Sequence, residues 1–276
     1  MNKHNKVIVF DLDGTLYSDT HHFDYYAERL MKKLPLDVRD SFLRDYQAAR
    51  QGKHVIKIGR VYDLQHDLVL THKDRVVTEA YEWNGYGITE ERVKWLYPEA
   101  ITIDNERMLS IGDLWWVPVP IARHYGLDEK TCHQAFLETR QYMTGPEFKM
   151  KETPGLKETL KDLYENKKLV LLTNSPEPDS RAILEKLGLS GLFHKYIFSG
   201  KKPTQTVHHF KSIKEQFGVE YREILSVGDN WVNEIHPVQG LGVKTLFINE
   251  YQLDASYHAD FVVSKLEEAI AILKRI

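Results

Sequence analysis

The chain has 276 residues, of which 42% are hydrophobic, and this is enough apolar sequence for one large domain or two smaller ones. The formal net charge is -3, with acidic and basic residues interleaved, so no broad positive surface is predicted for nucleic acid or anionic lipid. The single cysteine, Cys132, excludes a disulfide framework and a cysteine-rich zinc site. With no apolar run of membrane-spanning length, this composition favours a soluble, cytoplasmic protein.

The first predicted element is a short strand, Val7–Phe10, and a long segment of different character follows it. From residue 18 to residue 150 strand patterns are few, and apolar residues recur at the spacing of a helix. These residues are Phe23, Ala27, Leu30 and Met31, and then Phe42, Tyr46 and Ala49. A structureless excursion of this length is rare in a compact protein. We therefore predict a mainly helical inserted domain over residues 18–150.

After the turn signal Thr153-Pro154-Gly155, strand-like and helix-like segments alternate. Short apolar runs predict strands at Leu169–Leu172, Tyr196–Phe198, Ile224–Val227, Val243–Ile248 and Phe261–Val263. Helical spacing predicts helices around Leu156–Tyr164, Ile183–Leu187 and Val207–Phe217, and a last helix with Ser264 and Glu267 at the spacing of a capping box. This alternation predicts an α/β core with a doubly wound, Rossmann-like parallel sheet, built from residues 1–17 and 151–276.

The strand Val7–Phe10 runs directly into Asp11-Leu12-Asp13-Gly14-Thr15. Alternate residues of an extended segment point the same way, so Asp11 and Asp13 can address one point, and Gly14 lets the chain turn away. Two carboxylates at this spacing suit covalent phosphoryl transfer. One attacks phosphorus, and the other protonates the leaving oxygen and then activates water. An isolated Asp-x-Asp-Gly is more often only a turn at a strand end.

Three further predicted strands also end in polar residues. After Leu169–Leu172 come Thr173-Asn174-Ser175, whose hydroxyls and backbone N–H groups near a helix start can hold phosphate oxygens. After Tyr196–Phe198 come Ser199-Gly200-Lys201-Lys202-Pro203, where a lysine can neutralise a phosphate. After Ile224–Val227 come Gly228-Asp229-Asn230, with Glu234 one turn later, and an aspartate here can bind a hard cation.

The carboxyl ends of parallel strands share one edge of the sheet, so these four weak signals predict a single site. A phosphate dianion beside Asp11 and Asp229 would meet repulsion of roughly 4 kcal/mol per pair of unit charges at about 4 Å and an effective dielectric near 20. Such a cluster requires a lysine and a divalent cation. Oxygen ligands without a soft-ligand set favour Mg²⁺.

In this order the signals resemble the four motifs of the haloacid dehalogenase superfamily: Asp11-Leu12-Asp13-Gly14-Thr15, Thr173-Asn174, Lys202 before Pro203, and Gly228-Asp229 with a downstream acid. The resemblance covers the α/β segments, and residues 18–150 resemble the superfamily's helical cap. It implies that Asp11 is nucleophile and metal ligand, and that Asp13 is general acid/base with its backbone carbonyl on the metal. It also implies that Thr173, Asn174 and Lys202 bind the phosphoryl group and that Asp229 binds Mg²⁺. Glu234 stands where the family more often has aspartate, and it is expected to act behind the metal ligands.

The resemblance implies a Mg²⁺-dependent phosphohydrolase that acts on a small phosphate monoester through an aspartyl phosphate. Asp13 separates this chain from the superfamily's dehalogenases and phosphonatases, which lack that second aspartate. A phosphomutase of the same superfamily and a catalytically silent binding protein stay open as alternatives. Leu16-Tyr17 and residues 173–188 resemble the pyrimidine nucleotidase branch slightly, without identifying a substrate. The expected partner is a small phosphorylated metabolite, with neither nucleic acid nor a membrane.

Three other patterns have a competing interpretation. Residues 121–137 mimic a helix-turn-helix, but their charges balance, whereas DNA binding needs a positive face, so two packed cap helices are preferred. His66-Asp67 with His54 upstream is faintly similar to a metal-dependent phosphohydrolase of the His-Asp type, and scattered surface histidines explain it better. Trp115 and Trp116 could line a substrate pocket, and core packing is the preferred interpretation.

Overall fold

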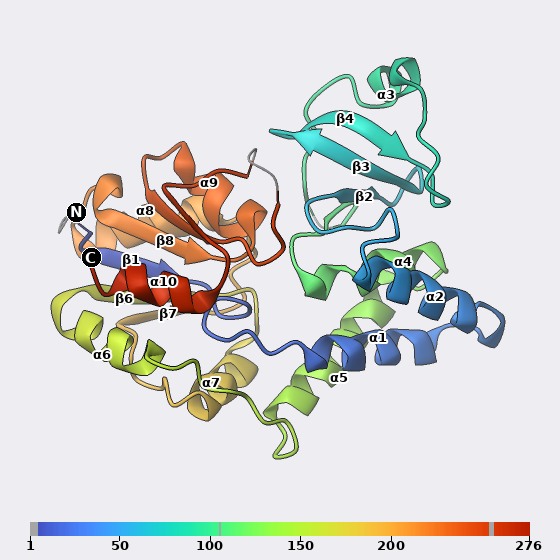
Figure 1. The fold of residues 1–276 in the computed structure, drawn as a ribbon. Coiled ribbons are helices and arrows are strands. Elements are labelled where there is room, and N and C mark those ends of the chain that lie inside the picture. Colours follow the sequence, from blue (N-terminus) through green and yellow to red (C-terminus); the bar gives the residue numbers. More distant parts are fainter. Residues whose placement is uncertain (1–4, 105, 254–256) are drawn as a thin grey trace. The chain divides into compact units, whose positions relative to one another are not determined.

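The computed structural model describes residues 5–104, 106–253 and 257–276. The chain forms two compact units, one made of Met1–Asp19 with Gln141–Ile276 and the other of Thr20–Arg140 (Figure 1). The two boundaries predicted from the sequence lie after residues 17 and 150. The helix α5 (Glu129–Thr144) continues across the second observed boundary, and the turn signal at Thr153-Pro154-Gly155 comes later in the chain.

The first unit contains a six-stranded sheet in the order β10-β9-β8-β1-β6-β7, and every pair in it is parallel. Its strands are β1 (Val7–Phe10), β6 (Lys168–Leu172), β7 (Lys195–Ile197), β8 (Ile224–Gly228), β9 (Lys244–Ile248) and β10 (Phe261–Val263). Each of the six strands predicted from the sequence is present, and the doubly wound α/β class is confirmed. The central strand β1 is apolar and buried at every position, because a parallel sheet is covered on both faces there.

Helices flank these strands, and each except the short helix His236–Gln239 corresponds to a helix predicted from the periodicity. They are α6 (Leu156–Asn166), α7 (Glu177–Lys186), α8 (Thr206–Phe217), the short α9 (His236–Gln239) and α10 (Leu266–Leu273), with a 3-10 turn η3 (Tyr221–Glu223) and one turn of π-helix η4 (Trp231–Ile235). A capping box between Ser264 and Glu267 was predicted at the start of α10, and Glu267 is the wrong partner. The backbone N–H and hydroxyl of Ser264 bond Glu268, not Glu267, because the helix begins at Leu266 and places Glu268 over the preceding turn.

Strand β1 lies at the point where the order of the sheet reverses. The chain passes from β1 to β6 and β7 on one side, and then returns to β8, β9 and β10 on the other. Phe10 pairs with Leu171 of β6 and with Val227 of β8, so the loops that follow these three strands emerge next to one another. In doubly wound sheets ligands bind at such a reversal, outside the carboxyl ends of the strands.

The second unit is mainly helical, as predicted. Its helices are α1 (His21–Lys33), α2 (Arg39–Arg50), α3 (Glu90–Leu96), α4 (Pro118–His124) and the larger part of α5, with 3-10 turns η1 (Leu36–Val38) and η2 (Leu114–Trp116). It also holds an antiparallel sheet in the order β4-β3-β2-β5, formed by β2 (Val61–Asp63), β3 (Leu68–Lys73), β4 (Val76–Tyr81) and β5 (Met108–Ser110). This sheet was not predicted.

Turn chemistry explains why the sheet could not be seen in the sequence. The β3–β4 hairpin turns at Asp74 and Arg75, whose φ angles are 50° and 70°, so two non-glycine residues occupy the left-handed region. The sequence signal for such a hairpin is normally Asn-Gly or Asp-Gly. The strands β2 and β5 have three residues each, too few to show a period of two.

The core of the second unit uses the helix faces that the spacing predicted. Phe42, Tyr46, Ala27 and Leu30 are buried in one cluster, against which Trp115 and Trp116 pack. Trp115 also lies edge-on to Phe23 and Phe136, with ring centroids 5.3 Å away in each case. Core packing of the tryptophans is therefore confirmed.

The helix-turn-helix mimic lies in the same core. Its apolar positions, Ala122, Leu127 and Ala135, are buried between α4 and α5, which supports the interpretation as two packed helices. Within the described residues, no helix combines the length and the apolar character needed to cross a membrane.

Candidate active site

Four loops at the carboxyl edge of the parallel sheet carry the predicted residues. Asp11 follows β1, Thr173 follows β6 and Asp229 follows β8, and Lys202 lies in the loop after β7. The Asp11 N–H donates to the carbonyl of Val227 at 3.1 Å, so the β1 ladder continues as far as the aspartate and fixes its backbone. The fold thus gives each predicted residue a place set by a strand end.

Lys202 is the centre of a buried charged cluster. Its ammonium nitrogen donates to Asp11 Oδ1 and to Glu234 Oε1, at 2.6 Å in each case. The exposed fractions are 4% for Lys202, 8% for Asp11 and 4% for Glu234. Lys201, the other lysine of this loop, is exposed. Water is largely excluded, so the attraction between these charges is much stronger than on a surface.

The charges in this cluster do not balance. Burial lowers the pKa of Lys202, but the charges of Asp11 and Glu234 outweigh burial, and the net pKa lies above its ordinary value. Burial raises the pKa of Asp11; the charge of Lys202 opposes this shift and the nearby charge of Asp13 reinforces it. One ammonium group serves two buried carboxylates, with a third close by, so the cluster holds excess negative charge that a cation would offset.

Glu234 enters the site because the chain forms a π-helical turn directly after β8. Its second oxygen, Oε2, accepts from the backbone N–H of Asn230 at 2.9 Å. Its backbone carbonyl accepts from the Ser226 hydroxyl at 2.8 Å. A Cβ at Gly228 would lie 2.5 Å from Glu234 Cγ, so only glycine leaves room for this carboxylate. Glu234 therefore positions Lys202, and it does so from a rigid turn.

Asp229 and the loop after β1 fit closely against each other. The Thr15 hydroxyl donates to Asp229 Oδ1 at 3.2 Å. Gly14 has a φ of 81°, and a Cβ there would lie 2.2 Å from Asp229 Oδ2. Glycine is thus required at this position both by backbone conformation and by the buried carboxylate. The arrangement brings Asp229 beside the turn that carries Asp11 and Asp13.

Asp13 is held by two hydroxyl groups that the sequence analysis did not assign. Tyr17 donates through a short hydrogen bond to Asp13 Oδ1, and Ser175 donates to Asp13 Oδ2 at 2.8 Å. The N–H groups of Thr15 and Leu16 both bond the Leu12 carbonyl, and this turn precedes Tyr17. The partners of Asp13 could not be read from the sequence, because a tight turn and a distant loop bring them together.

The loop after β6 combines a candidate phosphate ligand with a positioning residue. The Thr173 hydroxyl accepts from the Ser175 N–H at 3.0 Å, and as a hydroxyl it also has a proton to donate. The side chain of Asn174 faces Lys202 instead. Its Oδ1 accepts from the Lys202 N–H at 2.7 Å, and its Nδ2 donates to the Lys202 carbonyl at 3.0 Å. The Asn174 amide therefore ties the lysine loop to the β6 loop.

The donor set suits magnesium. Asp11 and Asp229 are buried carboxylates after neighbouring strands, and the cluster around them carries excess negative charge. No group of three or more His, Cys, Asp or Glu side chains arranged to hold a metal ion occurs among the residues that the structure describes. Mg²⁺ does not require one, since it is usually held by one or two carboxylates together with waters and substrate phosphate.

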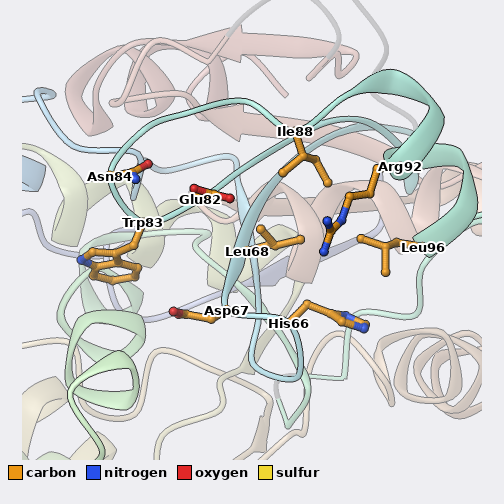
Figure 2. Close-up of a pocket in the computed structure, with 9 residues that line it drawn as sticks. All are labelled: His66, Asp67, Leu68, Glu82, Trp83, Asn84, Ile88, Arg92 and Leu96. Carbon is orange, nitrogen blue, oxygen red and sulfur yellow. The ribbon is translucent and has the colours of Figure 1, made fainter.

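A separate pocket of about 460 Å³ lies within the second unit, at the β3–β4 sheet and α3 (Figure 2). It is lined by His66, Asp67, Leu68, Glu82, Trp83, Asn84, Ile88, Arg92 and Leu96, and no predicted site residue is among them. His66 Nδ1 bonds the buried Asp63 at 2.7 Å, and His124 Nδ1 bonds Asp67 at 2.8 Å. His66 is exposed and bonds a carboxylate, which agrees with the interpretation of the His66-Asp67 pattern as surface histidines.

Known proteins match this fold. A family model of haloacid dehalogenase-like hydrolases matches residues 5–242, and a search of curated proteins finds no match. A predicted phosphoglycolate phosphatase from Haemophilus somnus 129pt shares 20% identity with a TM-score of 0.56, covering 98% of each chain. The candidate HAD hydrolase YfnB from Bacillus subtilis, solved with magnesium, shares 16% identity with a TM-score of 0.53, covering 98% of this chain and 99% of its own.

A candidate β-phosphoglucomutase from Thermotoga maritima shares 16% identity with a TM-score of 0.51, covering 98% of this chain and 99% of its own. Dehalogenases also match, including one with a TM-score of 0.51. At these identities the solved structures show the fold and do not distinguish between substrates. The family model covers most of the chain, and the four motifs converge on one sheet edge: this chain belongs to the haloacid dehalogenase-like hydrolases.

Proposed function

We propose that this hydrolase is a Mg²⁺-dependent phosphatase that cleaves a small phosphate monoester through a phosphorylated Asp11. The observation that carries the proposal is the buried cluster in which Lys202 lies 2.6 Å from Asp11 and from Glu234, with Asp13 nearby. A nucleophile, a cation for the phosphoryl group and a second carboxylate are thus held at one sheet edge. The enzyme class follows from the family, and the phosphate ester is our proposal.

In this proposal each residue acts at a stated step. A carboxylate oxygen of Asp11 attacks phosphorus, and the bond to the leaving oxygen breaks. Asp13 donates a proton to that oxygen, and then takes a proton from the water that hydrolyses the aspartyl phosphate. Lys202 and the Thr173 hydroxyl hold the phosphoryl oxygens, and inorganic phosphate leaves.

Asp13 is the feature that favours a phosphate ester over a halogenated acid. A halide ion is a good leaving group without protonation, whereas an alkoxide needs a proton as it departs. The chain supplies a carboxyl group for this purpose, two residues after Asp11 and fixed by hydrogen bonds on both oxygens. Dehalogenase activity would leave this arrangement without a role.

Magnesium would be held by Asp11, Asp229 and the backbone carbonyl of Asp13. When bound, it would offset the negative charge of the site and of the phosphoryl oxygens. The close fit of Gly14 and Thr15 around Asp229 keeps that carboxylate at the edge where Asp11 emerges. Glu234 accepts hydrogen bonds from the Lys202 ammonium group and from the Asn230 N–H. We therefore assign it to positioning the lysine and not to binding the metal.

The proposal predicts that turnover depends on a bound divalent metal ion. Excess chelator is expected to remove turnover of a panel of phosphate monoesters, and Mg²⁺ to restore it, because excess carboxylate charge repels a dianionic substrate. Ca²⁺ should restore little, since it accepts looser and higher coordination. Phosphate release is measured with each ion in turn. Full turnover in excess chelator would contradict the magnesium assignment.

A phosphomutase uses the same first step, so the same panel must separate the two activities. Inorganic phosphate as the product in water supports hydrolysis. Transfer to a second hydroxyl of a sugar phosphate, without net phosphate release, would favour the mutase. A purified protein that is inactive on the entire panel with Mg²⁺ would favour a silent binding protein.

A further inference from the structure

Tyr17 and Ser175 are the residues on which a further inference rests. Tyr17 is 1% exposed, and its hydroxyl lies inside the core unit on Asp13 Oδ1. Ser175 lies in the loop after β6 and donates to the other oxygen, Oδ2, at 2.8 Å. The two donors come from different elements, one from the turn after β1 and one from the loop after β6, and together they meet both oxygens of one carboxylate.

Both donors are themselves fixed. A backbone bridge pairs Tyr17 with Asp13, and the nearly complete burial of the ring leaves it little freedom. The Ser175 N–H donates to the Thr173 hydroxyl at 3.0 Å, and the Ser175 carbonyl accepts from the Ser199 N–H at 3.1 Å. With both donors anchored in this way, hydrogen bonds on both oxygens constrain the rotation of the Asp13 side chain and the plane of its carboxyl group.

We propose that Tyr17 and Ser175 form a clamp that sets the orientation of the Asp13 carboxyl group for proton transfer to the leaving oxygen. Both are positioning residues that act through Asp13. A carboxylate has two oxygens and about four acceptor positions, so a hydrogen bond on each oxygen can orient it. Hydroxyl groups suit this positioning role because they can both donate and accept hydrogen bonds. They can therefore stay bonded to Asp13 while it gains and loses a proton.

This inference rests on the proposed phosphatase activity and predicts a dependence on the leaving group. Tyr17→Phe keeps the ring and removes only the donor. An alkyl phosphate needs protonation of its leaving oxygen, and we expect its kcat/KM to fall about tenfold, within the range that general acid catalysis supplies. p-Nitrophenyl phosphate has a good leaving group, so its kcat/KM, which reports only the first chemical step, should change less than about twofold.

Three further variants make the test specific. Ser175→Ala should show the same selective loss on the alkyl ester. Tyr221→Phe is the control: Tyr221 begins η3, which precedes β8 and so lies away from the carboxyl edge of the sheet. Removing its hydroxyl should leave kcat/KM unchanged for both esters. In an Asp13→Ala background, Tyr17→Phe should have no further effect, because a residue that acts only through Asp13 cannot act without it.

An equal loss on both esters, or a loss that persists in the Asp13→Ala background, would show that Tyr17 acts by packing and would overturn the clamp. If wild-type protein with Mg²⁺ hydrolyses neither ester, the proposed function fails, and the clamp is judged by a crystal structure of Tyr17→Phe. A rotated Asp13 carboxyl group would support the clamp. An unchanged one would contradict it.

Discussion

Asp11→Asn is expected to lower phosphate ester turnover by at least about 10⁴-fold, because an amide cannot serve as the attacking group in covalent catalysis. The change is nearly isosteric, so Lys202 and the backbone bond to Val227 should stay in place. Turnover is measured at enzyme concentrations high enough to detect the residual rate. The matched control is Asp162→Asn, an exposed aspartate on α6 of the same unit, which should leave turnover unchanged.

The same change should not destabilise the protein. Burial and the charge of Asp13 raise the pKa of Asp11 against the opposing charge of Lys202, so the ionised carboxyl group is less favourable in the folded protein than in the unfolded chain. Removing that charge is expected to leave the free energy of unfolding in chelator unchanged or to raise it by about 1 kcal/mol. Urea unfolding of the two proteins checks this. A large fall in stability would show that Asp11 is a structural residue, and the loss of turnover would then lose its meaning.

Lys202→Met is expected to lower both stability and turnover, because it removes the ammonium group that lies 2.6 Å from Asp11 and from Glu234. Two buried carboxylates would lose the ammonium group that offsets their charge, which costs about 3–5 kcal/mol of folding stability. Phosphoryl binding would be lost as well, and we expect kcat/KM to fall at least about 10³-fold. Urea unfolding and steady-state kinetics measure the two effects.

The chain offers a control one residue away. Lys201→Met changes the same residue type at an exposed position of the same loop and should be close to wild type in both measurements. Adding Glu234→Gln to Lys202→Met should recover part of the lost stability but none of the activity, because it removes one uncompensated carboxylate. Failure to recover any stability would mean that the cost does not come from unpaired charge.

The α/β core could be predicted because its signals are local. Strands such as Val7–Phe10 and Ile224–Val227 are short apolar runs that end in polar residues, and a parallel sheet buries such runs on both faces. The order of the four motifs then placed Asp11, Thr173, Lys202 and Asp229 at neighbouring strand ends. Their gathering at one edge follows from the topology, so it required no knowledge of side-chain contacts.

The parts that could not be predicted depend on contacts between residues far apart in the chain. The partners of Asp13 include Ser175, and the side chain of Asn174 meets the Lys202 backbone, so sequence spacing gives no sign of either pairing. Glu234 was expected behind the metal ligands, and the structure places it on Lys202 through a π-helical turn that has no sequence signature. The antiparallel sheet of the second unit was hidden by short strands and by a hairpin turn without glycine.

The central claim is that Asp11 becomes phosphorylated, and a trapped intermediate tests it most directly. Asp13→Asn removes the base for the second step, while p-nitrophenyl phosphate makes the first step less dependent on an acid. Acid-quenched Asp13→Asn protein, digested and analysed by mass spectrometry, should carry a hydroxylamine-labile phosphoryl group on the peptide that contains Asp11. The Asp11→Asn, Asp13→Asn double variant should carry none. Phosphate on another residue, or a label that persists without Asp11, would contradict the assignment of the nucleophile.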